Sequence, residues 1–318
     1  MDKNSSPPSG SQPGVVNQAD FSLGDLIKAA RPRQWTKNFV CFAAVTFADR
    51  LFIAESVARG LIAVACFCLA SSAVYIINDL RDREQDQSHP LKRHRPIAAG
   101  RIQTRTAQLE ALILAAAALG LSLLLPQRFR YVLLLFFVLN MLYSVVLKQL
   151  PILDVMSIAL GFVLRVQSGI EAIKSPQSAW VVLCMFFMAL FLAAGKRRAE
   201  ILHPATIDPG NQRRVLREYS VSYLDLLLGI SATTALVCYS LYAITVQASE
   251  TFLITIIPVA FGILRYLMLV IVHTEGEGPD DLLTRDIPLI ITVITWALMC
   301  IAILYFKIHL FPTTQIPR

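Results

Sequence analysis

The chain alternates long apolar stretches with polar connections. We find nine stretches of mostly apolar residues, each of about 16 to 25 residues, long enough or nearly so to cross about 30 Å of hydrocarbon as a helix. These stretches cover residues 38–54, 57–77, 107–125, 130–147, 152–170, 180–195, 222–246, 252–272 and 288–308. Prolines such as Pro126 and Pro151 fall at the junctions, where they interrupt helices. The pattern predicts an all-α, polytopic membrane protein built as a bundle of about nine transmembrane helices.

Composition supports this class and excludes others. Of the 318 residues, 55% are hydrophobic and only 16% are charged, whereas a soluble domain usually carries about 25% charged residues. A soluble globular enzyme is therefore excluded, and so is a disordered chain, because disorder requires low hydrophobicity. The formal net charge of +7 is typical of basic cytoplasmic loops in a membrane protein, so it does not indicate a nucleic-acid partner.

The two ends of the chain differ in composition from the rest. Residues 1–20 are rich in Ser, Pro, Gly, Asn and Gln, and they lack the basic and apolar regions of a signal peptide. We expect a disordered cytoplasmic tail over 1–20, one membrane domain over 21–310 and a short carboxyl-terminal tail over 311–318.

Lysines and arginines in the polar segments and near the ends of the apolar stretches are divided unevenly between the two sides of the membrane. Twenty lie on the side that holds the amino terminus and the connections after the second and sixth stretches, and seven lie on the other side. Because basic connections stay in the cytoplasm, we expect the amino terminus and both long polar connections to be cytoplasmic. The carboxyl terminus is then outside.

An acidic cluster stands where the second apolar stretch ends, and it consists of Asn78, Asp79, Asp82 and Asp86. If the helix continues through them, the three aspartates lie within about 60° of one another on one face. Carboxylates this close repel one another. Mg²⁺ would offset that repulsion, since it prefers oxygen ligands and often binds through one or two carboxylates plus substrate phosphates. The alternative is a solvated helix end whose acids pair with neighbouring arginines.

A basic segment follows the acidic cluster within a few residues. Lys92, Arg93, His94 and Arg95 lie in the sequence HPLKRHRPIAAG, residues 89–100. Such a segment suits phosphate oxygens, although basic residues beside a membrane also bind anionic lipid headgroups. Beside the acidic cluster, it favours a site for a diphosphate with Mg²⁺.

These motifs resemble those of a known family. The nonapeptide NDLRDREQD, residues 78–86, resembles the NDxxDxxxD motif of the UbiA superfamily of intramembrane prenyltransferases. A closer resemblance is to the branch of that superfamily that transfers phosphoribosyl groups to polyprenyl phosphates. It rests on RPRQWTKN (31–38), SSAVYIINDLRDREQDQSHPLKRHRPIAAG (71–100), AGKRRAE (194–200) and ILRY (263–266). The resemblance implies a helical bundle in the bacterial plasma membrane, with a Mg²⁺-dependent site at its cytoplasmic face.

A basic cluster stands at the end of the sixth apolar stretch, and it consists of Lys196, Arg197, Arg198 and Glu200. Other members of the superfamily carry a second acidic motif, DxxxD, at the corresponding place. Phosphoribosyl pyrophosphate has a further phosphate on its ribose, so a site for it needs fixed cations as well as metal. The resemblance favours Lys196, Arg197 and Glu200 as donor-binding residues and leaves Arg198 open. The positive-inside rule alone would also place cations here.

Ionisable residues inside the apolar stretches are costly and are therefore functional candidates. Asp154 and Arg165 lie close to one face of the fifth stretch, about 16 Å apart along a helix. Arg165 either meets the phosphate of the acceptor or pairs with an acid on another helix. Tyr143, Lys148 and Arg265 are weaker candidates, because interfacial anchoring also explains them.

The segment before the first apolar stretch is basic and contains Trp35. An interfacial helix explains this composition. The family resemblance instead places some of the cations near the donor, and we select Lys37 and Asn38 because they are closest to the membrane.

The resemblance implies transfer of the 5-phosphoribosyl group from phosphoribosyl pyrophosphate to a long-chain polyprenyl phosphate, with release of pyrophosphate, toward cell-wall or other arabinan precursors. Asp79, Asp82 and Asn78 are the expected catalytic residues, and Asp79, Asp82 and Asp86 the expected Mg²⁺ ligands. The expected substrate-binding residues are Lys37, Asn38, Lys92, Arg93, Arg95, Tyr143, Arg165, Lys196, Arg197 and Glu200. A phosphate monoester is already largely dianionic at neutral pH, so no general base is required.

Two alternatives stay open at this point. Prenyl transfer from a polyprenyl diphosphate to an aromatic acceptor is the first, but it would be expected to use the missing DxxxD motif. A lipid or solute transporter is the second, although the ionisable residues gather at one membrane face and not at the midplane. The sequence is compatible with a homo-oligomer and does not define its size.

Overall fold

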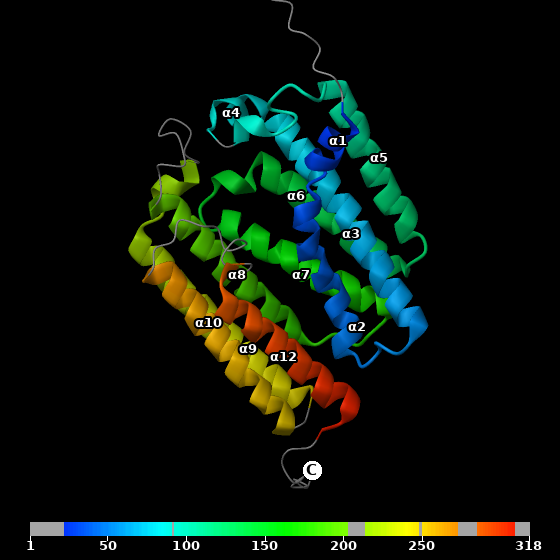
Figure 1. Cartoon of the computed structure of the whole chain (residues 1–318), viewed down its shortest axis with the longest axis vertical. Helices are drawn as coiled ribbons and strands as arrows, with labels where there is room; N and C mark the ends of the chain where they lie inside the picture. The colour runs from blue at the N-terminus through cyan, green and yellow to red at the C-terminus, as the bar shows by residue number, and fades with distance from the viewer. Residues whose placement is uncertain (1–21, 91, 203–213, 248–249, 273–284, 309–318) are drawn as a thin grey trace, which may run out of the picture.

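A computed structural model describes residues 22–90, 92–202, 214–247, 250–272 and 285–308. Within these ranges all regular structure is helical (Figure 1). The first half consists of α1 (Leu23–Ala29), η1 (Pro32–Phe42), α2 (Ala43–Phe47), α3 (Ala54–Arg81), α4 (Arg83–Ser88), η2 (Lys92–His94), α5 (Thr104–Ser122), α6 (Gln127–Val145) and η3 (Leu147–Gln149). The second half consists of α7 (Leu153–Ile173), α8 (Ala179–Leu202), η5 (Arg214–Glu218), α9 (Val221–Thr245), η6 (Glu250–Thr255), α10 (Ile256–Ile271) and α12 (Ile287–Phe306). The expected boundaries at residues 20–21 and 310–311 lie outside the described residues.

Seven segments of the described chain are long and apolar enough to cross a membrane. They are α3, α6, α7, α8, α9, η6 together with α10, and α12. The predicted class, an all-α polytopic membrane protein, is therefore confirmed. Two of the nine predicted stretches, 38–54 and 107–125, are not among these seven, so the count of nine stays a prediction.

The stretch 38–54 does not form the single α-helix that the apolar pattern predicts. Instead, the eleven residues of η1 form a 3-10 helix and the five residues of α2 continue it as an α-helix. Because a 3-10 helix rises about 2.0 Å per residue, the two elements together reach about 30 Å. A short segment thus runs alongside α3 and α7 through the bundle (Figure 1).

A glycine on α7 lets this first segment pack closely. A Cβ atom at Gly169 would lie 1.9 Å from the carbonyl oxygen of Cys41 in η1. Since no side chain tolerates such an approach, Gly169 lets the backbones of η1 and α7 touch.

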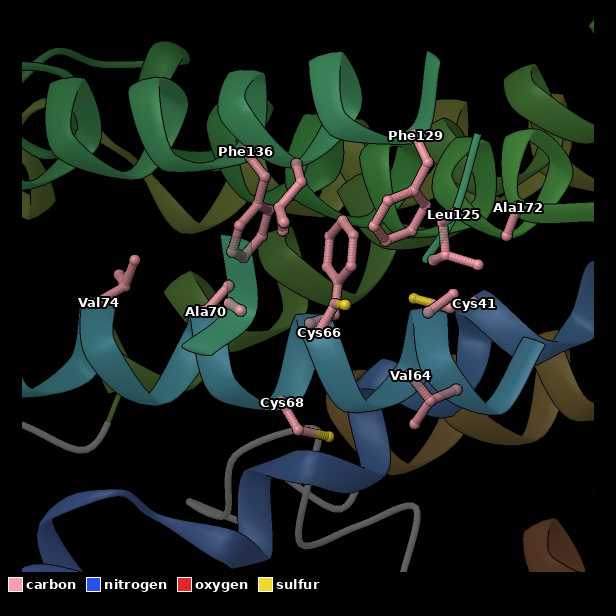
Figure 2. Close-up of a cluster of buried hydrophobic side chains, with 14 residues drawn as sticks. Cys41, Val64, Cys66, Cys68, Ala70, Val74, Leu125, Phe129, Phe136 and Ala172 are labelled. Atoms are coloured by element: carbon pink, nitrogen blue, oxygen red, sulfur yellow. The ribbon is translucent and has the colours of Figure 1, made fainter. Parts of the chain in front are cut away.

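Aromatic side chains of α6 pack against α3 in a core that Cys41 of η1 also joins. Figure 2 shows Phe129 and Phe136 reaching from α6 toward α3. The ring of Phe67 lies with its centroid 4.9 Å from that of Phe136 and 6.1 Å from that of Phe129. Burial of such rings contributes both apolar area and favourable edge contacts. A second core forms where α8, α9, α10 and α12 meet.

Candidate active site

The acidic cluster lies at the carboxyl end of α3, beside α4 at the top of Figure 1. The one-face arrangement of the three aspartates requires α3 to continue through the cluster, and it does not. It ends at Arg81, and Asp82 separates α3 from α4. As a result the three aspartates pair with three different cations rather than gathering at one point.

Arg95 of the basic segment holds two of the acids together. One of its terminal nitrogens, Nη1, lies 3.1 Å from Asp79 Oδ1 and 2.7 Å from Asp86 Oδ2. Asp79 also pairs with Arg31, which follows α1 and lies over the ring of Tyr75. Asp79 and Asp86 are buried, so their charges need these partners.

The third aspartate has a different partner. Lys148, in η3, places its ammonium 2.7 Å and 3.0 Å from the two carboxylate oxygens of Asp82. Arg31 was not among the expected site residues, and Lys148 was only a weaker candidate. The sequence separates these residues from their partners by 48 and 66 positions, so no local pattern indicates the contacts.

The donor atoms of the cluster are suited to a hard divalent cation. Among the described residues, the buried acceptor Asn78 Oδ1 has no hydrogen-bond partner, and a cation next to Asp79 and Asp82 would satisfy it. Within the described residues no three His, Cys, Asp or Glu side chains are gathered as a complete metal site. The oxygen atoms of Asn78, Asp79 and Asp82 are nevertheless of the kind that Mg²⁺ prefers, since Mg²⁺ takes few protein ligands and completes its shell with water and substrate phosphate.

The rest of the basic segment stays closer to the surface. Arg93 is exposed and Lys92 is half-buried, whereas Ile97 and Ile102 are buried against α3 and α5. Gln87 of α4 donates to the carbonyl of Ala98 at 3.1 Å. The apolar residues thus fold the segment back over the acidic cluster and leave its first cations at the outer edge.

The basic cluster at the end of α8 sends its cations in different directions. Arg197 is 1% exposed. Its Nε lies 2.7 Å from Asp154 Oδ2 of α7, and its Nη1 lies 2.6 Å from Glu200 Oε2. Arg198 pairs instead with Asp225 of α9 and donates to a carbonyl of α10. Lys196 is exposed.

The two clusters are connected through the junction between α6 and α7. Lys148 contacts the acidic cluster, and Asp154, six positions later in the sequence, contacts the basic cluster. Tyr143, near the end of α6, also interacts electrostatically with Arg197. The residues from 143 to 154 thus bring the two halves of the expected site to one region.

Two further candidates, Arg165 and Asn38, meet inside the bundle. Arg165 is 7% exposed. Its Nε donates to Asn38 Oδ1 at 2.8 Å and its Nη1 to the Gly161 carbonyl at 3.0 Å. The rings of Phe136 and Phe162 lie about 5 Å from the guanidinium. In the part of the chain that is described, Arg165 forms no ion pair with an acid, so the expected alternative of an interhelical acid partner is not seen.

The positions of two remaining candidates, Lys37 and Arg265, do not by themselves indicate a role. Lys37 is half-buried in η1, close to Asn38 in sequence. Arg265 pairs with Asp286 and connects α10 to the start of α12. This contact joins two helices.

The chain belongs to the UbiA prenyltransferase family, whose model matches residues 38–277. Among its relatives, the decaprenyl-phosphate phosphoribosyltransferase of Mycolicibacterium smegmatis is 36% identical over 300 residues, which cover 90% of this chain and 94% of the relative. The enzyme of the same name from Mycobacterium tuberculosis H37Rv is 35% identical over 289 residues, with 89% and 95% covered. That of Corynebacterium glutamicum is 33% identical over 299 residues, with 91% and 89% covered.

Solved structures of the family share the fold. A UbiA homolog from Archaeoglobus fulgidus bound to DMAPP and Mg²⁺ superposes with a TM-score of 0.70 at 18% identity, covering 88% of this chain and 99% of the other. A UbiA homolog from Aeropyrum pernix K1 gives a TM-score of 0.63 at 13% identity, covering 82% and 96%. At such identities the likeness concerns the fold alone.

Proposed function

We propose that this chain transfers the 5-phosphoribosyl group from phosphoribosyl pyrophosphate to a polyprenyl phosphate in the membrane and releases pyrophosphate. The bond from the anomeric carbon to pyrophosphate breaks, and an acceptor phosphate oxygen bonds to that carbon. The observation that carries the proposal is the pairing of an acidic cluster with a basic one across the junction of α6 and α7. The names of the relatives support the same reaction.

The acidic cluster would bind the diphosphate end of the donor. Asp79 and Asp82 would hold Mg²⁺, with Asn78 and Asp86 in support. When bound, the metal would stabilise negative charge on the departing pyrophosphate. Arg95 and Lys148 already lie against these carboxylates, and we assign them to the diphosphate oxygens and to neutralising the acids. Lys92 and Arg93 are assigned to the same diphosphate.

The basic cluster would bind the other end of the donor. Lys196 is exposed at the end of α8, and we assign it to the phosphate on the ribose. Replacement of Lys196 by alanine should raise the KM for phosphoribosyl pyrophosphate about tenfold, the loss of one charge-assisted contact. The KM for the lipid should stay unchanged, and an equal rise in both constants would contradict the assignment.

We assign the interior pair of Arg165 and Asn38 to the acceptor. A buried cation without an acid partner attracts an anion, and the phosphate of a polyprenyl lipid is the anion that the reaction brings into the membrane. Lys37, which precedes Asn38 in η1, and Tyr143, which interacts electrostatically with Arg197, would help to orient the two phosphate groups.

We also propose an orientation and a location. The amino terminus and both clusters would lie at the cytoplasmic face of a bacterial plasma membrane, with the carboxyl terminus outside, and the excess of basic residues on one side supports this orientation. The donor is water-soluble and the acceptor is a lipid, so a site at this face serves both. The lipid product would supply arabinan synthesis.

Transfer of label tests the proposal. Purified protein in detergent would be incubated with phosphoribosyl pyrophosphate labelled in the ribose, a ladder of polyprenyl phosphates and Mg²⁺. We expect label in the organic phase only when both substrates are present, and its loss on chelation should be reversed by added Mg²⁺. Transfer from a labelled prenyl diphosphate to an aromatic acceptor, with none from the ribose donor, would overturn the proposal.

A further inference from the structure

The turn before α7 is strained. Ile152 has φ +70° and ψ −46°, and the N–H of Leu153 donates to the carbonyl of Pro151 at 2.8 Å. This is the rare form of the γ-turn, which a β-branched residue adopts only where its surroundings hold it. Strain of this kind is often found beside functional sites.

Tyr219 holds this turn from the other side. Its hydroxyl oxygen accepts a hydrogen bond from the backbone N–H of Ile152 at 2.6 Å and donates its proton to Asp154 Oδ1, also at 2.6 Å. The tyrosine is buried with Val215, Leu216 and Leu224. Burial raises the pKa of its phenol, so the hydroxyl keeps the proton that it donates.

Asp154 connects the turn to α8 through Arg197. It is fully buried, and its second oxygen accepts from Arg197 Nε, whose Nη1 in turn reaches Glu200. A buried carboxylate keeps one orientation when both oxygens are hydrogen-bonded. We call the chain Ile152, Tyr219, Asp154, Arg197 and Glu200 the Tyr219 relay.

Glu200 is the last of the three charged members of the relay, and 20% of its side chain is exposed, whereas Asp154 and Arg197 are buried. A carboxylate repels phosphate oxygens, and it accepts hydrogen bonds from hydroxyl groups. Of the groups in the donor, the ribose hydroxyls are the ones that it can bind. Nothing in the sequence indicated Tyr219, because it lies 65 positions from Asp154.

We propose that Tyr219 is a positioning residue, which with the strained turn at Ile152 orients Asp154 and Arg197 so that Glu200 meets the ribose hydroxyls of the donor. This inference rests on the proposed function. It adds recognition of the sugar, separate from recognition of the phosphates by the metal and the other cations.

The test compares two matched tyrosine variants. Tyr219→Phe keeps the buried ring and removes only the hydroxyl. Tyr223→Phe is the control, because its ring stacks on that of Tyr219 at 5.9 Å and belongs to no part of the relay. Each variant would be assayed for kcat, for the KM of both substrates, for inhibition by pyrophosphate and for its melting temperature.

We expect Tyr219→Phe to raise the KM for phosphoribosyl pyrophosphate about five- to tenfold, as for one lost hydrogen bond. The KM for polyprenyl phosphate and the inhibition constant of pyrophosphate, which has no ribose, should match those of the control. Glu200→Gln should reproduce the rise. An unchanged KM for the donor would overturn the role of the relay, and so would equal changes in the KM for the donor, the KM for the lipid and the inhibition constant of pyrophosphate. In either case turnover by the wild type would leave the proposed function standing. No turnover by the wild type would overturn both.

Discussion

Two buried arginines in this bundle are stabilised in opposite ways. Arg197 lies between two carboxylates, those of Asp154 and Glu200. Arg165 contacts an amide oxygen, a backbone carbonyl and two phenyl rings, and among the described residues it forms no ion pair. Both are almost without exposed surface, so solvent does not explain the difference.

The difference separates a positioning cation from a binding one. Carboxylates have neutralised Arg197, and the gain from their attraction offsets the cost of burial only while all partners are present. Dipoles and rings lower the energy of Arg165 but leave its charge uncompensated, and an uncompensated charge favours an anionic ligand. We therefore assign Arg197 to the architecture of the donor site and Arg165 to the acceptor.

Replacing Arg197 should have the larger effect on stability. Arg197→Met leaves Asp154 buried with Tyr219 as its one remaining hydrogen-bond partner among the described residues, and the loss in unfolding free energy should be about 3–5 kcal/mol. Unfolding in mixed micelles measures it. The double variant with Asp154→Asn removes the stranded charge and should recover most of the loss. A single variant as stable as the double one would contradict a compensated pair.

Replacing Arg165 should cost less stability and change binding. Arg165→Met strands no carboxylate among the described residues, so the loss should be about 1–2 kcal/mol, as for its two hydrogen bonds. The KM for polyprenyl phosphate should rise about tenfold, while that for phosphoribosyl pyrophosphate stays the same. Arg165→Lys keeps the charge, so its KM for polyprenyl phosphate should lie between those of the wild type and Arg165→Met. A variant with normal lipid KM would assign Arg165 to structure alone.

The ion pair of Arg198 should have the smallest effect. Asp225 is 35% exposed and Arg198 keeps its bond to the Val270 carbonyl. Asp225→Asn should therefore change the unfolding free energy by less than about 1 kcal/mol, as for surface pairs. Both KM values should stay at wild-type levels. A loss of unfolding free energy as large as that of Arg197→Met would show that solvent exposure does not explain the difference between the ion pairs of Arg197 and Arg198.

The sequence predicts the later helices well because each carries its own apolar signal. α7, for example, covers Leu153–Ile173 where the pattern indicates 152–170. The sequence does not predict the 3-10 geometry of η1, since apolar residues at membrane depth fit either helix type. The close approach at Gly169 also depends on a partner 128 positions away.

The candidate site shows the same division. The motif of the acidic cluster is local, so it can be recognised from the sequence. Its partners Arg31 and Lys148, and the pairing of Asp154 with Arg197, depend on contacts between distant elements. The family resemblance predicts that Arg197 binds the donor directly, whereas its burial between two acids favours an indirect role.

The central claim is that the acidic cluster stabilises the pyrophosphate as it departs from the donor. The decisive measurement is the rate of label transfer from phosphoribosyl pyrophosphate to polyprenyl phosphate by wild type and by Asp82→Asn, at equal amounts of folded protein. We predict a rate at least about 1,000-fold lower for the variant, since the charge that stabilises the leaving group is lost, with an unchanged melting temperature. A rate within about tenfold of wild type would correspond to less than about 1.4 kcal/mol of transition-state stabilisation and would contradict the central claim.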